Sequence, residues 1–217
     1  MPVTTNDLVP ASLAKLMAER KRLAVPWTPH NYQEWALEFE LGNPFGGLLL
    51  DPGLGKTSIT LAEFVVLLKK RMMKRALVVA PLRAIYDVWP MEISDWKEFN
   101  KLGVAILHDG GKDKVLRSLR PEHQVALINP EGFPWLAQGN RLKQLAADTL
   151  IVDECFAAGT LVATPNGAVP IELLKVGDKV YNNTGACSNL KPWLKALMPI
   201  RPFQSLSAVL TALWLSQ

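Results

Sequence analysis

Several residue types and patterns are scarce in this chain of 217 residues, and each scarcity excludes a class of protein. Only two cysteines occur, Cys155 and Cys187, which excludes a scaffold held together by disulfides. The apolar runs are far shorter than the roughly 18 residues that a membrane-spanning helix needs, so we expect no membrane partner. The first thirty residues mix acids, bases and prolines, unlike a secretory signal. We therefore expect a cytoplasmic location.

An excess of one charge is also nearly absent from most of the chain. The net charge is +4, and residues 155–217 hold five bases and two acids, so that residues 1–154 carry only +1. Charge alone therefore does not indicate nucleic-acid binding. Apolar residues make up 49% of the chain and charged residues 20%, which is typical of a globular protein with a sizeable core.

Expected strands and helices alternate over residues 28–154. Continuous apolar runs, as in parallel strands covered on both faces, occur at residues 47–50, 76–80, 104–107, 125–128 and 149–152. Helices are expected between them, for example over residues 56–69, 89–99 and 111–119. This order predicts an α/β fold with a doubly wound parallel sheet. Another helix is expected over residues 10–24, in an N-terminal extension that covers residues 1–27.

A glycine-bearing loop with the sequence Gly-Leu-Gly-Lys-Thr at residues 53–57 joins the first expected strand to the helix after it. This order is the context that a phosphate-binding loop requires, although Leu50 breaks the strict eight-residue pattern. Lys56 would reach the β- and γ-phosphates, and Thr57 would supply a hydroxyl ligand for Mg²⁺. Backbone N–H groups at the helix start would surround the phosphates. The predicted nucleotide-binding residues here are Gly53, Leu54, Gly55, Lys56, Thr57 and Ser58; the alternative is a chance glycine turn before a helix.

Two acids, Asp153 and Glu154, end the last apolar run of this region. Asp153 is placed to hold Mg²⁺ through water, and Glu154 is placed to polarise the water that attacks the γ-phosphate. Taken alone, such a pair is usually a strand meeting solvent. Together with the upstream loop, the pair predicts an ATP-hydrolysing site.

These residues resemble the motifs of Swi/Snf-type superfamily 2 DNA helicases, especially those of phages. Residues 51–57 resemble motif I and residues 152–154 resemble motif II. Gln33 stands where that family contacts adenine. The looser matches are residues 79–82 followed by Trp89, Glu92 and Trp96 for motif Ia, and residues 126–131 for motif Ib. The resemblance covers about residues 28–154 and implies a RecA-like lobe that uses ATP and Mg²⁺. It also implies contacts with the DNA backbone through the Ia and Ib loops. The rings of Trp89 and Trp96 themselves are predicted to pack in the core.

Members of that family need a second RecA-like lobe, which supplies an arginine finger and closes the ATP cleft. Nothing in residues 155–217 resembles such a lobe. We therefore expect the 217 residues to bind ATP but to hydrolyse it poorly, and not to translocate on DNA by themselves. Whether the chain acts as an enzyme is left open at this point.

The character of the sequence changes after Glu154, where residues 160–181 become short β-like pieces and the alternation of helices and strands stops. An initial Cys155 is followed by Thr-x-Val-x-Thr-x-x-Gly at residues 160–167 and by Val-Gly-Asp-x-Val at residues 176–180. Residues 155–185 thus resemble the N-terminal block of an intein, a Hint-type self-splicing domain, which implies a small β-rich fragment. The resemblance implies that the Cys155 thiol attacks the carbonyl of Glu154 and forms a thioester. The alternative is that Cys155 is a small buried apolar residue.

The intein block is incomplete. Inteins need a Thr-x-x-His block, but no histidine follows His123, and the His-Asn end that releases an intein is absent. Splicing within this chain is therefore not expected. Two origins stay open, namely half of a split intein that needs a complementary polypeptide with the helicase C-terminal part, or a truncated relic.

The tail, residues 186–217, loosely resembles the helicase segment between motifs II and III, although the sequence after Thr211 departs from motif III. A deletion and a change of reading frame would produce this tail; an apolar helical tail that packs on the core is the alternative. Three functions therefore compete: an ATPase lobe of a helicase from a bacterium or a phage-infected cell, a precursor that splices only with a partner, and an inert fragment.

Overall fold

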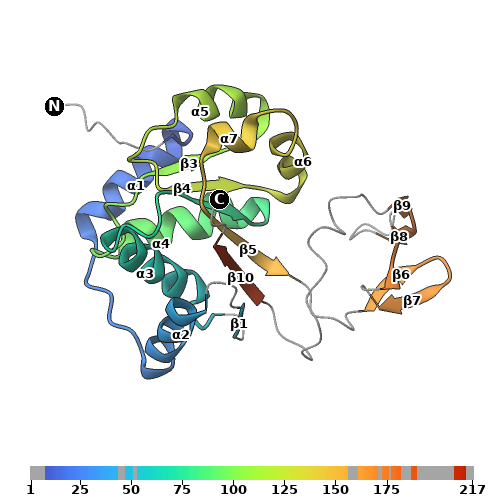
Figure 1. The fold of residues 1–217 in the computed structure, drawn as a ribbon, viewed down its shortest axis with the longest axis horizontal. Coiled ribbons are helices and arrows are strands. Elements are labelled where there is room, and N and C mark those ends of the chain that lie inside the picture. Colours follow the sequence, from blue (N-terminus) through green and yellow to red (C-terminus); the bar gives the residue numbers. More distant parts are fainter. Residues whose placement is uncertain are drawn as a thin grey trace.

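A six-stranded sheet with helices on both faces forms the main body of the protein (Figure 1). The structure is a computed structural model and describes residues 8–43, 47–50, 53–155, 161–170, 173–175, 177–181, 187–189 and 208–213. The strand order of the sheet is β1-β10-β5-β2-β4-β3. The strands are β1 (Gly47–Leu49), β2 (Ala76–Val79), β3 (Val104–Ile106), β4 (Val125–Ile128), β5 (Thr149–Cys155) and β10 (Ala208–Leu213). The predicted α/β fold with a parallel sheet is confirmed for β2, β3, β4 and β5, which pair in parallel.

Helices cover the sheet in two groups. The helices are α1 (Ala11–Leu23), α2 (Asn31–Gly42), α3 (Lys56–Lys69), α4 (Trp89–Asp95), α5 (Lys112–Ser118), α6 (Phe133–Leu136) and α7 (Arg141–Leu145). A π-helical turn, Ala84–Val88, leads directly into α4. None of the helices in the described part of the chain is long and apolar enough to cross a bilayer.

The two faces of the sheet bury different residues because successive side chains of a strand point to opposite sides. Ala76 and Val78 of β2 belong to a core shared with α1, α3 and α4, whereas Leu77 and Val79 belong to a core shared with α5, α6 and α7. Every residue of β2 is therefore buried. This two-sided burial explains the continuous apolar runs of the sequence.

The predicted helix over residues 89–99 is shorter in the structure. It ends at Asp95, and Trp96 takes an extended conformation that forms a bridge with Val25. The backbone N–H groups of Val25 and Lys97 donate to Asp95 and Val25 respectively. The segment after α1 thus provides backbone partners for residues 95–97. These contacts would not form if the helix continued to residue 99. Helical periodicity alone does not reveal this pairing.

The sheet gains a strand, β10, that the sequence reading did not expect. β10 lies between β1 and β5 and is antiparallel to both. Residues 208–213 of the tail are thus a strand and not the helix considered as an alternative. The rest of the tail, residues 186–217, lies outside the described residues apart from Cys187–Asn189, which form β9.

Residues after β5 form two small hairpins. β6 (Leu161–Thr164) pairs with β7 (Gly167–Pro170), and β8 (Lys179–Tyr181) pairs with β9 (Cys187–Asn189), both antiparallel. Gly167 has φ +108°, a conformation that favours glycine, at the first position of β7. The expectation of short β pieces after Glu154 is therefore confirmed for these residues.

Candidate functional site

The glycine loop before α3 has the backbone that a phosphate-binding loop needs. Gly53 and Gly55 have φ of +85° and +72°, a left-handed conformation that side chains with a Cβ disfavour. A Cβ on Gly55 would lie 2.5 Å from Nε2 of Gln33. The Ile59 N–H donates to the Gly55 carbonyl, which starts the helical pattern of α3. The backbone N–H groups that precede Ile59 lie in the first turn of the helix, where no carbonyl of the helix can accept them. This loop and the start of α3 therefore fit a phosphate group.

Lys56 is the first residue of α3, and its side chain turns back over the loop. Its Nζ donates to the Leu50 carbonyl at the end of β1 at 2.7 Å. The ammonium is thus held on the loop side of the helix start, where it would meet a bound phosphate. Thr57 follows in the same turn and is half-buried.

Gln33 touches this loop directly, although not in the way the sequence predicts. Its Oε1 accepts the N–H of His30 at 2.9 Å and caps α2, and its Nε2 donates to the Leu54 carbonyl at 3.3 Å. The Tyr32 hydroxyl donates to the same carbonyl at 3.3 Å. Both ends of the buried Gln33 amide therefore bind within the chain and join α2 to the loop. The adenine contact of Gln33 stays a prediction.

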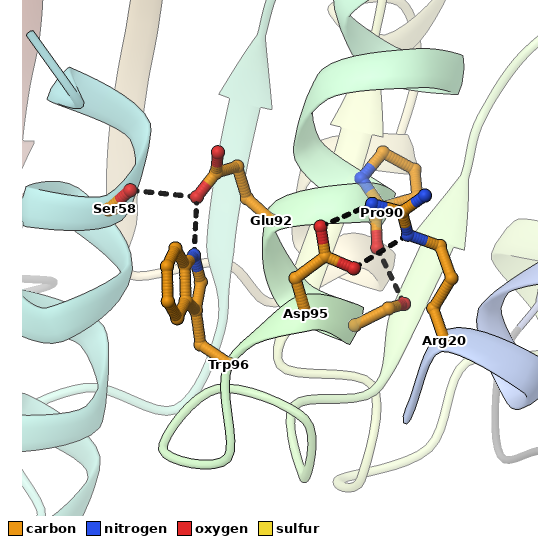
Figure 2. Close-up of polar contacts among 7 residues, drawn as sticks. Arg20, Ser58, Pro90, Glu92, Asp95 and Trp96 are labelled. Carbon is orange, nitrogen blue, oxygen red and sulfur yellow. Dashed lines mark hydrogen bonds and ion pairs between the residues drawn. The ribbon is translucent and has the colours of Figure 1, made fainter. Parts of the chain in front are cut away.

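Ser58 turns away from the loop into a carboxylate contact with α4. Its buried hydroxyl donates to Oε2 of Glu92 at 2.7 Å, and Nε1 of Trp96 donates to the same oxygen at 2.8 Å. Figure 2 shows this Glu92 oxygen between Ser58 on α3 and the Trp96 ring. A nucleotide contact by Ser58 would therefore come from its backbone N–H, because its side chain is already engaged.

Trp89, the first residue of α4, contacts Asp153, which belongs to the predicted acid pair of the site. Nε1 of Trp89 donates to Oδ2 of Asp153 at 2.8 Å. The Trp89 ring is fully buried and packs on Phe64 of α3, with ring centroids 6.3 Å apart. The predicted core packing of Trp89 is therefore correct, and the polar contact with Asp153 is an addition that sequence reasoning missed.

The strand register brings the glycine loop after β1 and the acids at the end of β5, the two halves of the predicted site, to one edge of the sheet. Leu48 of β1 and Asp153 of β5 both pair with Val209 of β10, so their backbones are about 10 Å apart at ordinary strand spacing. The carboxyl ends of parallel strands are the usual ligand edge of an open α/β sheet. The loop that begins after β1 and the acid at the end of β5 therefore share this edge.

Glu154 and Cys155 complete β5. Cys155 pairs with Ala208, and the register shift there leaves Glu154 as the extra residue of a bulge. The predicted nucleophile Cys155 is therefore the last residue of the strand that carries Asp153.

The other end of α4 is anchored to the N-terminal helix. The Arg20 guanidinium on α1 makes two bonds to the Asp95 carboxylate, at 2.6 and 2.5 Å (Figure 2). The bond to Asp95 raises the pKa of Arg20. Inside α4, the Ser94 hydroxyl donates to the Pro90 carbonyl at 2.7 Å. α4 is thus held by α1 at its end and by α3 and β5 along one side.

A buried acid, Glu63, lies two turns after Lys56 on α3. It is 1% exposed, and burial raises its pKa to about 7. Its Oε2 makes no hydrogen bond in the structure. Burial thus favours the neutral form of the Glu63 carboxyl, and sequence reasoning did not single this residue out.

The stretches that resemble motifs Ia and Ib continue from the carboxyl ends of β2 and β4, at the edge of the sheet where β5 carries Asp153. In the second stretch, Nδ2 of the buried Asn129 donates to Oε2 of Glu131 at 2.6 Å, a contact within the loop after β4. The contact of both stretches with nucleic acid stays a prediction.

Comparisons with known proteins agree with the two parts of the chain. The model of the SNF2-related domain matches residues 25–157, and the model of the Hint domain matches residues 154–201. "Putative protein p41" of Acyrthosiphon pisum secondary endosymbiont phage 1 is 24% identical over 154 residues, 70% of this chain. The chain spans 31% of the length of that relative. The Sulfolobus solfataricus SWI2/SNF2 ATPase core, solved in complex with dsDNA, is 26% identical over 61% of this chain and 28% of its own, with a TM-score of 0.47.

Proposed function

This chain belongs to the SNF2-related domain family, and on that premise we propose that residues 28–154 bind ATP and Mg²⁺ as the N-terminal lobe of a DNA helicase or translocase. Use of a nucleotide and a divalent metal is general in the family. The observation that carries the proposal for this chain is the loop at residues 53–57, with two left-handed glycines and a lysine at the start of α3. DNA is the proposed partner, through the loops after β2 and β4.

Each proposed site residue has a distinct role. Backbone N–H groups of residues 53–58 bind the phosphate oxygens, and the Lys56 ammonium neutralises their charge. Thr57 would hold the cation through its hydroxyl, and Asp153 would hold it through water with its carboxylate, oxygen groups of the kind that Mg²⁺ prefers. Glu154 orients the attacking water and accepts its proton. When bound, the cation neutralises the charge that develops on the phosphates.

The proposal predicts a specific effect of a Cβ in the loop. Gly55→Ala is expected to lower the affinity for MgATP about tenfold, because the left-handed backbone costs a residue with a Cβ about 1–2 kcal/mol. The new Cβ would also displace Nε2 of Gln33, which lies 2.5 Å from its position. Isothermal titration calorimetry of the 217-residue chain with MgATP measures the change.

Gly110→Ala is the matched control, since a Cβ there has no atom within 4 Å. We expect its affinity for MgATP to equal that of the parent chain. A parent chain that binds no MgATP would overturn the proposed function. Equal affinities of Gly55→Ala and the parent would show that the phosphate lies elsewhere.

A second function is favoured by the Hint-domain match at residues 154–201 and by the position of Cys155 directly after the lobe. We propose that Cys155 performs an N-to-S acyl shift. Its thiolate adds to the Glu154 carbonyl carbon, the C–N bond between the two residues breaks, and the nitrogen takes a proton and becomes the free amine of Cys155. The product is a thioester of Glu154, which a complementary polypeptide would resolve in trans.

Dithiothreitol tests this shift because it exchanges with a thioester and releases the chain that ends at Glu154. Intact-mass spectrometry is expected to show a 1–154 product from the parent chain and none from Cys155→Ala. Cys187→Ala, which removes the other cysteine, should cleave like the parent. Cleavage after Glu154 that persists without Cys155 contradicts the acyl shift, and an unchanged parent mass favours the inert fragment.

A further inference from the structure

The two predicted halves of the cation site come from distant parts of the chain, yet one short helix contacts both. Thr57 lies in the first turn of α3 and Asp153 lies at the end of β5. On α4, Trp89 binds the carboxylate of Asp153, and Glu92 binds Ser58, the neighbour of Thr57. Trp89 and Glu92 are three residues apart, so they lie on the same side of α4.

We propose that Trp89 is a positioning residue that orients the Asp153 carboxylate for the divalent cation. This inference rests on the proposed function of Asp153. An indole N–H is only a donor, and it donates here to Oδ2 of Asp153 at 2.8 Å. A carboxylate has about four lone-pair positions, so the bond from Trp89 restricts its rotation and occupies only one of these positions itself.

The surroundings of Trp89 make this bond rigid. The ring is fully buried and packs on Phe64, which belongs to α3, the helix that begins at the phosphate loop. The far end of α4 is tied to α1 through Arg20 and Asp95. A donor held by its own packing and by an anchored helix keeps its acceptor in one orientation, and carboxylates that are held by such partners bind metals more tightly.

Trp89→Phe tests the inference because phenylalanine keeps an aromatic ring beside Phe64 and removes the indole N–H, together with part of the bicyclic ring. Binding of a fluorescent ATP analogue to the full chain is measured with Mg²⁺ and with EDTA. In the parent, Mg²⁺ is expected to increase the affinity. In Trp89→Phe, the affinity in EDTA should be unchanged, and the Mg²⁺ concentration for half-maximal enhancement should rise at least about tenfold.

Trp96→Phe is the matched control. It removes an indole bond of the same length, 2.8 Å, on the same segment, but the acceptor is Glu92 and not Asp153. If Trp89 had a purely structural role, Trp89→Phe and Trp96→Phe would change the nucleotide affinity alike, both in EDTA and in Mg²⁺. An unchanged Mg²⁺ requirement in Trp89→Phe overturns the inference and leaves the proposed function in place, whereas no binding by the parent overturns both.

A second measurement does not depend on the folding of a variant. In the ¹⁵N-labelled parent chain, the indole N–H resonance of Trp89 should shift when Mg²⁺ is added to the ADP complex. The Trp96 resonance should shift much less. A Trp89 resonance that does not respond to Mg²⁺ in the presence of bound ADP contradicts the positioning role.

Discussion

Lys56→Ala is expected to lower the affinity of the chain for MgATP by at least about 100-fold, which corresponds to about 2.7 kcal/mol. The reason is that the Lys56 ammonium is the cation held over the loop at the start of α3, and hydrogen bonds between charged groups are the strongest single contacts to a phosphate. Calorimetric titration with MgATP gives the affinity of both proteins.

The same substitution should change the stability only slightly. In the structure, Lys56 donates a half-buried hydrogen bond to the Leu50 carbonyl, and the loss of such a bond costs about 1 kcal/mol. The melting temperature should therefore fall by no more than about 4 °C. Lys69→Ala removes the same charge from the exposed end of the same helix and should bind MgATP like the parent. Equal affinities of the two variants would contradict the role of Lys56.

The largest effect on stability is expected from Arg75→Met. Arg75 is buried before β2, where Nε donates to the His123 carbonyl at 2.7 Å, Nη2 donates to the Arg120 carbonyl at 2.7 Å, and Nη1 donates to the Leu145 carbonyl. Methionine keeps much of the side chain volume but removes the guanidinium donor from all three carbonyls, of which the Arg120 carbonyl keeps the His123 N–H. We expect the free energy of unfolding to fall by about 2–4 kcal/mol, measured by urea denaturation.

Burial and charge have opposite effects on the pKa of Arg75. Burial lowers the pKa of Arg75, and the nearby Asp148 raises it. Arg117→Met is the control, because Arg117 is an exposed residue of α5 and its loss should change the unfolding free energy by less than about 0.5 kcal/mol. A similar small change in Arg75→Met would show that water replaces the guanidinium at no cost.

Much of the fold followed from local patterns in the sequence. The predicted strand at residues 125–128 and the predicted helix at residues 56–69 have the same bounds in the structure. Both are strongly apolar, and the helix begins just after the glycine at which the backbone turns left-handed. The position of Asp153 at the same edge of the sheet as the glycine loop also followed from the sequence. Buried strands alternate with helices there, and the loops at the carboxyl ends of such strands meet at one edge.

Other features depended on partners far away in the sequence. Arg75 looks like an ordinary surface base in the sequence, yet the starts of β2, β4 and β5 converge on it. The amide of Gln33 joins α2 to the phosphate loop, a contact that the sequence did not indicate. Such contacts join residues that lie 20 to 70 positions apart, and periodicity carries no information on them.

The sequence by itself determined which residues make up the proposed sites: a glycine loop ending in Lys56 and Thr57, an acid pair at the end of a buried strand, and a cysteine directly after that pair. Residue type and spacing were enough, because backbone freedom at glycine and the charges of the side chains are local properties. Only the tertiary structure decided that β10 enters the sheet between β1 and β5, and that α4 joins Ser58 to Asp153 through Glu92 and Trp89. Strand order and the partners of buried polar groups are set by which surfaces pack together, and that depends on the whole chain.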